Sequence, residues 1–209
     1  MSFLNLIISF IVSLALLLIA MTVHEFAHGL TAHQLGDSTA KVGGRLTLNP
    51  LAHIDPFWTL LLPLVLFLTT SGRFVFGAAK PVPINYWALK NPKKDIIWIG
   101  LSGPLANLIL ASIIAGVLKF IPLSGILAYL LFNLLTINVV LAIFNLIPIP
   151  PLDGSRVLMG LLPTNLAEQY AKFERYGFII LFVFIWLGAL DHILWPLVSL
   201  VMSLMGVGS

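Results

Sequence analysis

The hydrophobic residues of this chain fall into long, nearly uninterrupted runs instead of alternating or amphipathic patterns. A run of about 20 apolar residues is long enough to cross a bilayer as a helix. Runs of that order cover about 3–28, 96–118, 126–148 and 175–190, with shorter ones at about 57–71 and 193–205. The pattern predicts an all-α polytopic membrane protein, a bundle of about five to six transmembrane helices. It leaves open whether 193–205 spans the membrane or lies at its surface.

Turn-forming and charged residues fill the gaps between these runs. The segment GDSTAKVGGRLTLNP contains a Gly-Gly pair and the β-compatible stretch RLTL, which predicts a short β-hairpin. The segment GRFVFGAAKPVPIN holds two prolines around one valine, so it is expected to be extended. The segment NLIPIPPLDG has three prolines in four positions, so no regular helix continues through it.

The short run at 57–71 decides the topology. Suppose that this run dips into the bilayer and that 72–83 returns to the same side. The end of the first helix, near His28, and the end of the 126–148 helix, near Pro148, then meet on one side of the membrane. Ten of the eleven Lys and Arg residues then share that side, and only Lys119 lies opposite. The ten are Lys41, Arg45, Arg73, Lys80, Lys90, Lys93, Lys94, Arg156, Lys172 and Arg175. If 57–71 spans instead, the loop 72–95 moves five of them away. Because cytoplasmic loops are enriched in Lys and Arg, the re-entrant arrangement is favoured, with that side facing the cytoplasm.

The composition supports one membrane-embedded unit. The 209 residues are 59% hydrophobic and 9% charged, against about 25% charged in soluble domains. We therefore expect a single domain over 1–209, with a core at 3–158 and C-terminal helices within 175–205. The net charge of +3 reflects loop residues that orient the chain, so no nucleic-acid partner is expected. The first run lacks a basic start and a cleavage site, and we expect it to be a retained helix.

Residues 24–28 read HEFAH, an H-E-x-x-H motif at the end of the first apolar run. On a helix, His24 and His28 lie on one face, so both imidazoles can bind one metal ion. Glu25 lies about 100° around the helix and can handle protons without being a ligand. Zinc peptidases use this arrangement. Three ionisable groups in an apolar helix are costly, which favours a functional role over a chance match.

A catalytic zinc ion takes three protein ligands, so a third is needed. The chain has no cysteine, which leaves His, Asp or Glu. His33 is rotated about 140° from the ligand face, and His53 and Asp55 lie in a polar turn. Asp153 follows an apolar run through the proline-rich break, and its alternative role is to cap the helix that follows.

Three motifs in this order, HEFAH, SGPLAN at 102–107 and NLIPIPPLDG at 145–154, resemble the site-2 protease family of intramembrane metalloproteases. The resemblance covers about residues 15–158 and is closest to the compact branch without PDZ or CBS domains. It implies that His24, His28 and Asp153 hold one Zn²⁺ per chain, with Glu25 as the general base. It also implies a catalytic role for Asn145 in holding substrate or stabilising the oxyanion, for which helix-end hydrogen bonding is the alternative.

Asn107, Gly103 and Pro104 are candidates for close helix packing, with catalysis as the alternative for Asn107. Asp191 and His192 are expected at the outer interface, with Trp195 as an anchor.

The function expected from these residues is intramembrane zinc endopeptidase activity on transmembrane segments of membrane proteins. The location expected is the cell membrane, with the active site toward the cytoplasm. Two alternatives use the same ligands: a membrane metal transporter or metallochaperone, and a catalytically inactive scaffold that binds helices. Neither needs Glu25, so a Glu25→Gln variant separates them from the protease.

Overall fold

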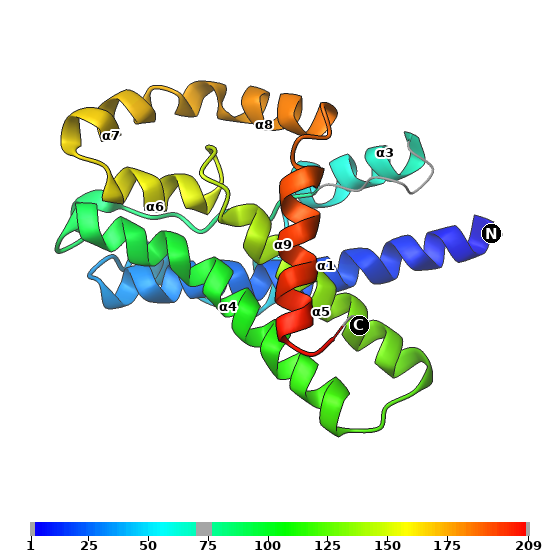
Figure 1. The fold of residues 1–209 in the computed structure, drawn as a ribbon. Coiled ribbons are helices and arrows are strands. Elements are labelled where there is room, and N and C mark those ends of the chain that lie inside the picture. The colour runs from blue at the N-terminus through cyan, green and yellow to red at the C-terminus, as the bar shows by residue number, and fades with distance from the viewer. Residues whose placement is uncertain (1–2, 70–76, 208–209) are drawn as a thin grey trace.

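The structure, a computed structural model, describes residues 3–69 and 77–207, and all of its regular elements in these ranges are helices (Figure 1). Each predicted apolar run corresponds to a helix or a pair of helices. The elements in chain order are α1 (Phe3–Gln34), α2 (Thr39–Val42), η1 (Pro50–His53), η2 (Pro56–Leu61), α3 (Leu62–Thr69), η3 (Tyr86–Ala88), α4 (Pro92–Phe120), α5 (Gly125–Asn145), α6 (Asp153–Leu161), α7 (Thr164–Ala171), η4 (Glu174–Tyr176), α8 (Gly177–Trp186) and α9 (Asp191–Leu204).

Three of these helices, α1, α4 and α5, are long and apolar enough to cross a membrane. Residues 164–186 and 191–204 form a further pair bent by 81°, which counts as a fourth span at most. The prediction of an all-helical membrane protein is confirmed, whereas the expected five to six spans are not. One reason lies between α8 and α9, where Gly188 has a φ of +67°. A left-handed residue ends a right-handed helix, so the last two apolar runs do not form straight spans.

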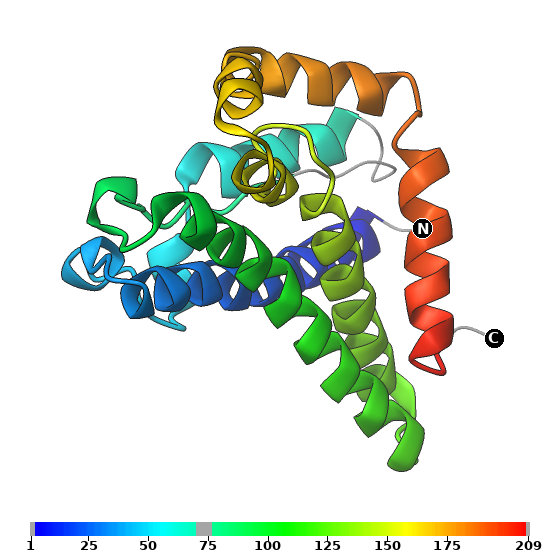
Figure 2. The same ribbon diagram turned by 60° about the vertical axis from the view of Figure 1, so that its left-hand side comes forward.

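Helix α4 packs against α1, α5 and α6. Helices α4 and α5 form a hairpin, and α9 lies against it in both views (Figures 1 and 2). Their shared core is aliphatic: Ala111, Ile114 and Ala115 from α4, Leu135, Val139 and Ile143 from α5, and Leu194 and Val198 from α9. The Ala residues let α4 approach closely, which is how helices pack where lipid removes the hydrophobic drive between them.

The described part of the run at 57–71 forms most of η2 and all of α3. Asp55 caps the π-helix η2 by accepting hydrogen bonds from the next backbone amides, and α3 follows directly. Phe67 of α3 packs on Phe10 of α1, with ring centroids 4.7 Å apart. The amide of Ala78 then donates to the carbonyl of Trp58 at 3.1 Å. The chain is therefore back beside η2 at residue 78, and re-entry into the bilayer stays a prediction. Residues 70–76 lie outside the described ranges.

The predicted β-hairpin at 36–50 is not found: residues 43–48 form turns and bends, and no strand occurs in 3–69 or 77–207. Arg45 explains the difference, since its guanidinium donates to the carbonyls of Ala52 and Lys80. The segment is therefore pinned to other segments instead of pairing with itself. The β propensity of RLTL was a weaker signal than these tertiary contacts.

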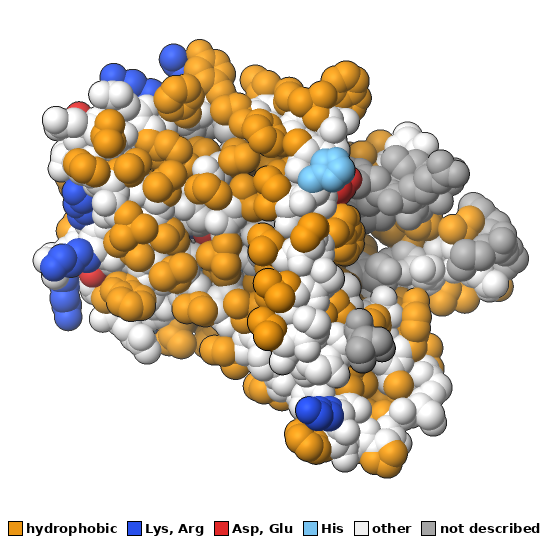
Figure 3. Space-filling model, in the orientation of Figure 1, with side chains coloured by type: hydrophobic (Ala, Val, Ile, Leu, Met, Phe, Trp, Pro, Cys, Tyr) orange, Lys and Arg blue, Asp and Glu red, His pale blue; other side chains and the backbone are white. Residues whose placement is uncertain are grey.

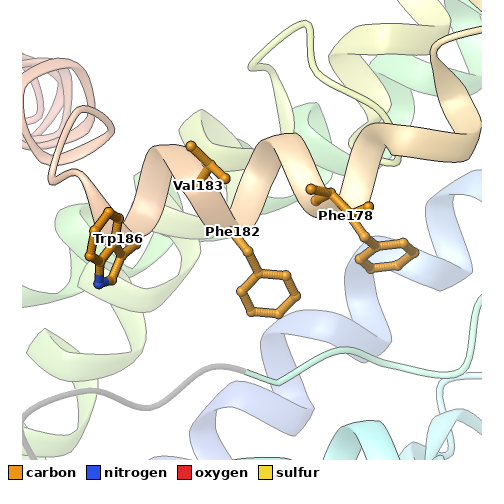
Figure 4. A pocket seen from close by; sticks show the side chains of 5 residues that line it. Phe178, Phe182, Val183 and Trp186 are labelled. Carbon is orange, nitrogen blue, oxygen red and sulfur yellow. The ribbon is translucent and has the colours of Figure 1, made fainter.

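Helix α8 carries an exposed apolar pocket lined by Phe178, Ile179, Phe182, Val183 and Trp186 (Figure 4). The Phe178 ring stacks on Trp58 of η2, with centroids 5.7 Å apart, and so joins α8 to the re-entrant segment. The space-filling view also shows hydrophobic side chains spread widely over the surface (Figure 3). Such a surface suits a chain whose solvent is lipid.

Candidate active site

The two histidines of HEFAH point from one face of α1 to a single carboxylate oxygen. His24 Nε2 lies 2.9 Å and His28 Nε2 lies 3.1 Å from Asp153 Oδ2. The three ligand atoms lie within 4.8 Å of one another, and all three residues are buried. The i, i+4 spacing places both imidazoles on one face of α1, and the carboxylate of Asp153 is the third possible metal ligand.

Asp153 reaches the site because the chain breaks after α5. Pro148, Pro150 and Pro151 lack amide hydrogens, so α5 ends and the chain turns through short-range bonds before α6. Gly154 makes this turn possible, because a Cβ there would collide with the carbonyl of Leu146. Leu152 occupies the N-cap position of α6, and the side chain of Asp153 faces His24, His28 and Arg156 instead of the amides of the first turn. The capping alternative is therefore wrong for this aspartate.

The outer nitrogen of each imidazole faces an oxygen acceptor. His24 Nδ1 lies 2.6 Å from Asn107 Oδ1, and His28 Nδ1 lies 2.6 Å from the carbonyl oxygen of Ile99. Asn107 is fixed in this orientation because its amide nitrogen donates to Ala20 O and to Asn138 Oδ1. Asn138 is fixed in turn, because its own amide nitrogen donates to Leu134 O.

These partners determine the tautomer. Each Nδ1 donates its hydrogen outward, so each neutral ring presents a lone pair on Nε2. Two lone pairs and a carboxylate oxygen thus converge, an arrangement that a divalent cation stabilises. Two imidazoles and one carboxylate, each imidazole held by a further acceptor, could hold a catalytic divalent metal ion such as zinc.

Gly103 of α4 leaves the room for this centre. A Cβ at Gly103 would collide with His28 Nε2 and would lie 2.6 Å from His24 Nε2. The neighbouring Ser102 hydroxyl donates to Ile99 O at 2.7 Å, next to the His28 bond. The motif SGPLAN therefore shapes the metal site directly, beyond the helix packing expected from its sequence.

Glu25 is half-buried beside the ligands and is not among them. Its Oε2 accepts a hydrogen bond from the backbone amide of Val82 at 2.7 Å. Arg156 of α6 donates to the second oxygen of Asp153 at 3.2 Å. The site thus pairs its carboxylate ligand with a cation and anchors the non-ligand carboxylate on the backbone.

The other candidates lie elsewhere. His33 contacts Ser38 and Lys41, and Asp55 caps η2. His53 is fully buried and donates from Nε2 to Thr47 O. The amide of Asn145 donates to Leu141 O in its own helix, which is the helix-end bond expected as its alternative role.

Sequence reasoning missed four parts of the site: Asn138, Arg156, the Val82 amide and the carbonyl of Ile99. A buried asparagine inside an apolar helix was the available signal for Asn138, since such residues pair inside the bundle. No side-chain pattern marks a carbonyl such as that of Ile99.

The fold and this centre point to a class, a membrane metalloprotease, with a two-histidine, one-aspartate group that could hold its metal ion. Comparison with known proteins agrees. The family model described as peptidase family M50 matches residues 121–188. YwhC of Bacillus subtilis, named a candidate zinc metalloprotease, is 36% identical over 192 residues, covering 88% of this chain and 84% of that protein. Rip2 of Mycolicibacterium smegmatis, which is also named a candidate zinc metalloprotease, is 33% identical over 207 residues. The match covers 96% of this chain and 76% of that protein.

The zinc metalloprotease MJ0392 of Methanocaldococcus jannaschii is 32% identical over 90 residues, covering 43% of this chain and 24% of that protein. No solved structure matches the chain. The chain belongs to peptidase family M50, the site-2 protease family, and is a zinc metalloprotease.

Proposed function

We propose that this enzyme hydrolyses peptide bonds in or near the transmembrane segments of membrane proteins. The observation that carries the proposal is the buried convergence of His24, His28 and Asp153 inside the helix bundle. His24 lies ten residues before the end of α1, about 15 Å along the helix. The apolar run of α1 ends at about residue 28, only about 6 Å beyond His24, so we place the site in the apolar part of the helix near one edge of the hydrocarbon core, where a substrate bond would have to reach it.

In this proposal His24, His28 and Asp153 would hold one zinc ion, which when bound would supply Lewis acidity to a water molecule and to the carbonyl of the scissile bond. Glu25 takes a proton from the attacking water on its free oxygen and returns it to the leaving amine. Asn107 and the Ile99 carbonyl keep both imidazoles in the ligating tautomer. A helical substrate keeps its carbonyls in internal hydrogen bonds, so it must unwind locally before cleavage.

Asn145 is proposed to hold the substrate or its oxyanion. Its amide now bonds to Leu141 O, so this role requires the side chain to turn when substrate binds. We also propose that residues 1–209 act as one peptidase domain, with a core at 3–158. The packing of α9 against α4 and α5 supports including the C-terminal helices within 175–205.

We place the site toward the cytoplasm in a cell membrane. Lys and Arg side chains gather at the end of the molecule where α1 ends and α4 begins, and one group lies at the opposite tip (Figure 3). The exposed residues near the first end include Lys41, Lys90, Lys93 and Lys94, and Lys119 lies in the last turn of α4. The positive-inside rule supports this orientation. Arg73 lies outside the described residues.

Glu25→Gln tests the function directly. Proteoliposomes containing the chain and a single-span protein would be assayed for cleavage, with zinc measured in each preparation. We expect Glu25→Gln to keep one zinc per chain and to lose cleavage by at least about a hundredfold, the low end for general-base catalysis. Glu168→Gln, the same change at an exposed position of α7, is the control and should cleave normally.

Membranes from cells carrying the parent chain or Glu25→Gln would then be compared for single-span proteins that accumulate only with the variant. Undiminished cleavage by Glu25→Gln would refute the protease mechanism. Zinc flux that persisted in this variant, without cleavage by the parent chain, would favour a transporter instead.

A further inference from the structure

Glu25 is bonded to a segment nearly 60 positions further along the chain. The backbone amide of Val82 donates to Glu25 Oε2, with N and O 2.7 Å apart. This distance is at the short end for an amide bound to a charged oxygen. Val82 lies in residues 77–85, here called the proline segment, which follows the re-entrant run and contains no helix.

The two prolines leave Val82 with an isolated amide. Pro81 and Pro83 carry no amide hydrogen, so Val82 has the only one between Lys80 and Ile84. A residue before proline is also restricted to extended conformations, which holds the Val82 backbone in one shape. The sequence Pro-Val-Pro thus presents a single donor on a stiff support.

The proline segment is anchored on both sides of Val82. Three of its amides bond to fixed acceptors, and its Lys80 carbonyl accepts from the Arg45 guanidinium: Ala78 N to Trp58 O at 3.1 Å, Lys80 N to His53 O at 2.9 Å, Asn85 N to Asp37 Oδ2 at 2.6 Å and Arg45 Nη2 to Lys80 O at 3.0 Å. The Val82 side chain is only 6% exposed and packs beside Gly29, one turn after Glu25 on α1. The donor is therefore fixed relative to α1.

We propose that the Val82 amide is a positioning group that orients Glu25 for proton transfer; this inference rests on the proposed role of Glu25 as the base. Helix α1 fixes only the Cα–Cβ direction of a side chain with three further torsions. The Val82 bond fixes Oε2 and so determines where the other oxygen points. Among the described residues Oε1 accepts no hydrogen bond, which leaves it for the proton.

Two substitutions at one position separate the amide from the side chain. Val82→Pro removes the hydrogen and keeps an apolar side chain on an extended backbone, whereas Val82→Ala keeps the hydrogen and removes more of the buried side chain. Positioning predicts that Val82→Pro lowers kcat by about 10- to 100-fold, the size of a lost bond to a charged group. KM should stay within about twofold and zinc at one per chain, while Val82→Ala should lose less than about threefold.

The reverse order, with Val82→Ala the weaker enzyme, would show that the side chain matters by packing and would overturn the proposal. Unchanged activity of Val82→Pro would overturn it too. Increased activity would also overturn it, because the bond from Val82 to Glu25 would then be inhibitory. If Glu25→Gln still cleaves, the proposed function fails. If Glu25→Gln is inactive but Val82→Pro matches Val82→Ala, only the positioning role fails.

Hydrogen exchange tests the bond without any change at Val82 and without activity. Mass spectrometry of the full chain in detergent would follow the amides of the proline segment in the parent and Glu25→Ala proteins. The Val82 amide should exchange at least about tenfold faster in Glu25→Ala, because its charged acceptor is gone. The Lys80 amide, bonded to His53 O, should not change and is the internal control. Equal exchange at Val82 in both proteins would overturn the proposal.

Discussion

Gly103→Ala should weaken zinc binding while leaving the helix bundle folded. The added Cβ would lie 2.6 Å from His24 Nε2, against at least 3.4 Å for an ordinary contact, so the ring must move by about 0.8 Å. Zinc–ligand distances tolerate only about 0.2 Å. The other escape is a shift of α4, which would open its interfaces with α1, α5 and α6. Either way the ligand geometry is lost.

The expected magnitude follows from the linkage between binding and stability. Disturbing the surroundings of ligands weakens metal affinity by about 10- to 100-fold. At a zinc concentration about 100 times the parent dissociation constant, zinc stabilises the parent protein by about 2.7 kcal/mol. A hundredfold weaker variant gains only about 0.4 kcal/mol under the same conditions. The assay is the zinc-induced rise in Tm of the purified protein in detergent, with bound zinc measured after dialysis.

Gly116→Ala is the matched control, because it is the same change on the same helix. A Cβ there meets nothing within 4 Å, so zinc binding should be unchanged. The metal-free protein should be equally or slightly more stable, by up to about 1 kcal/mol, because alanine favours a helix over glycine. Equal zinc affinity of Gly103→Ala and the parent protein would refute the claim that α4 confines the imidazoles.

Asn138→Leu should weaken zinc binding by about tenfold, because it removes the acceptor that orients the Asn107 amide and so the tautomer of His24. Asn133→Leu removes an asparagine that, among the described residues, bonds only to its own helix and should leave zinc affinity, measured by metal titration, unchanged. Asp37 accepts bonds from two amides and a hydroxyl, and although burial raises its pKa, these bonds hold the pKa below its usual value. Its stabilisation is therefore complete above about pH 4 and lost as the pH falls through the lowered pKa, so Asp37→Asn should flatten the acid side of a Tm–pH curve, and an unchanged curve would contradict this. Because the chain has no cysteine, Lys93→Cys and Lys119→Cys can be labelled singly in intact cells, and an impermeant maleimide should react only at position 119.

The sequence could predict the parts of this protein that depend on local periodicity. The helix period alone places His24 and His28 on one face and Glu25 off it. Apolar runs predict α1, α4 and α5, and the proline cluster predicts the end of α5. Each of these follows from backbone geometry within a few residues, so no distant contact was needed.

What local pattern could not supply is the choice between competing partners. Sequence reasoning narrowed the third ligand to Asp153 through family resemblance, but only the fold shows its oxygen between both imidazoles. The RLTL stretch has the residues of a strand, yet Arg45 bonds across to Ala52 and Lys80 and the hairpin does not form. A single guanidinium with several carbonyl acceptors outweighed a weak propensity.

The sequence by itself determined that this is a helical membrane protein with a zinc motif near the end of its first helix, because hydrophobic length and the 3.6-residue period are local properties. Tertiary structure decided which groups complete the motif. Asn107, Asn138 and the Ile99 carbonyl set the imidazole tautomers, and Val82 holds Glu25. These contacts join residues 31 to 83 positions apart, and such distances in sequence become contacts only when the helices pack.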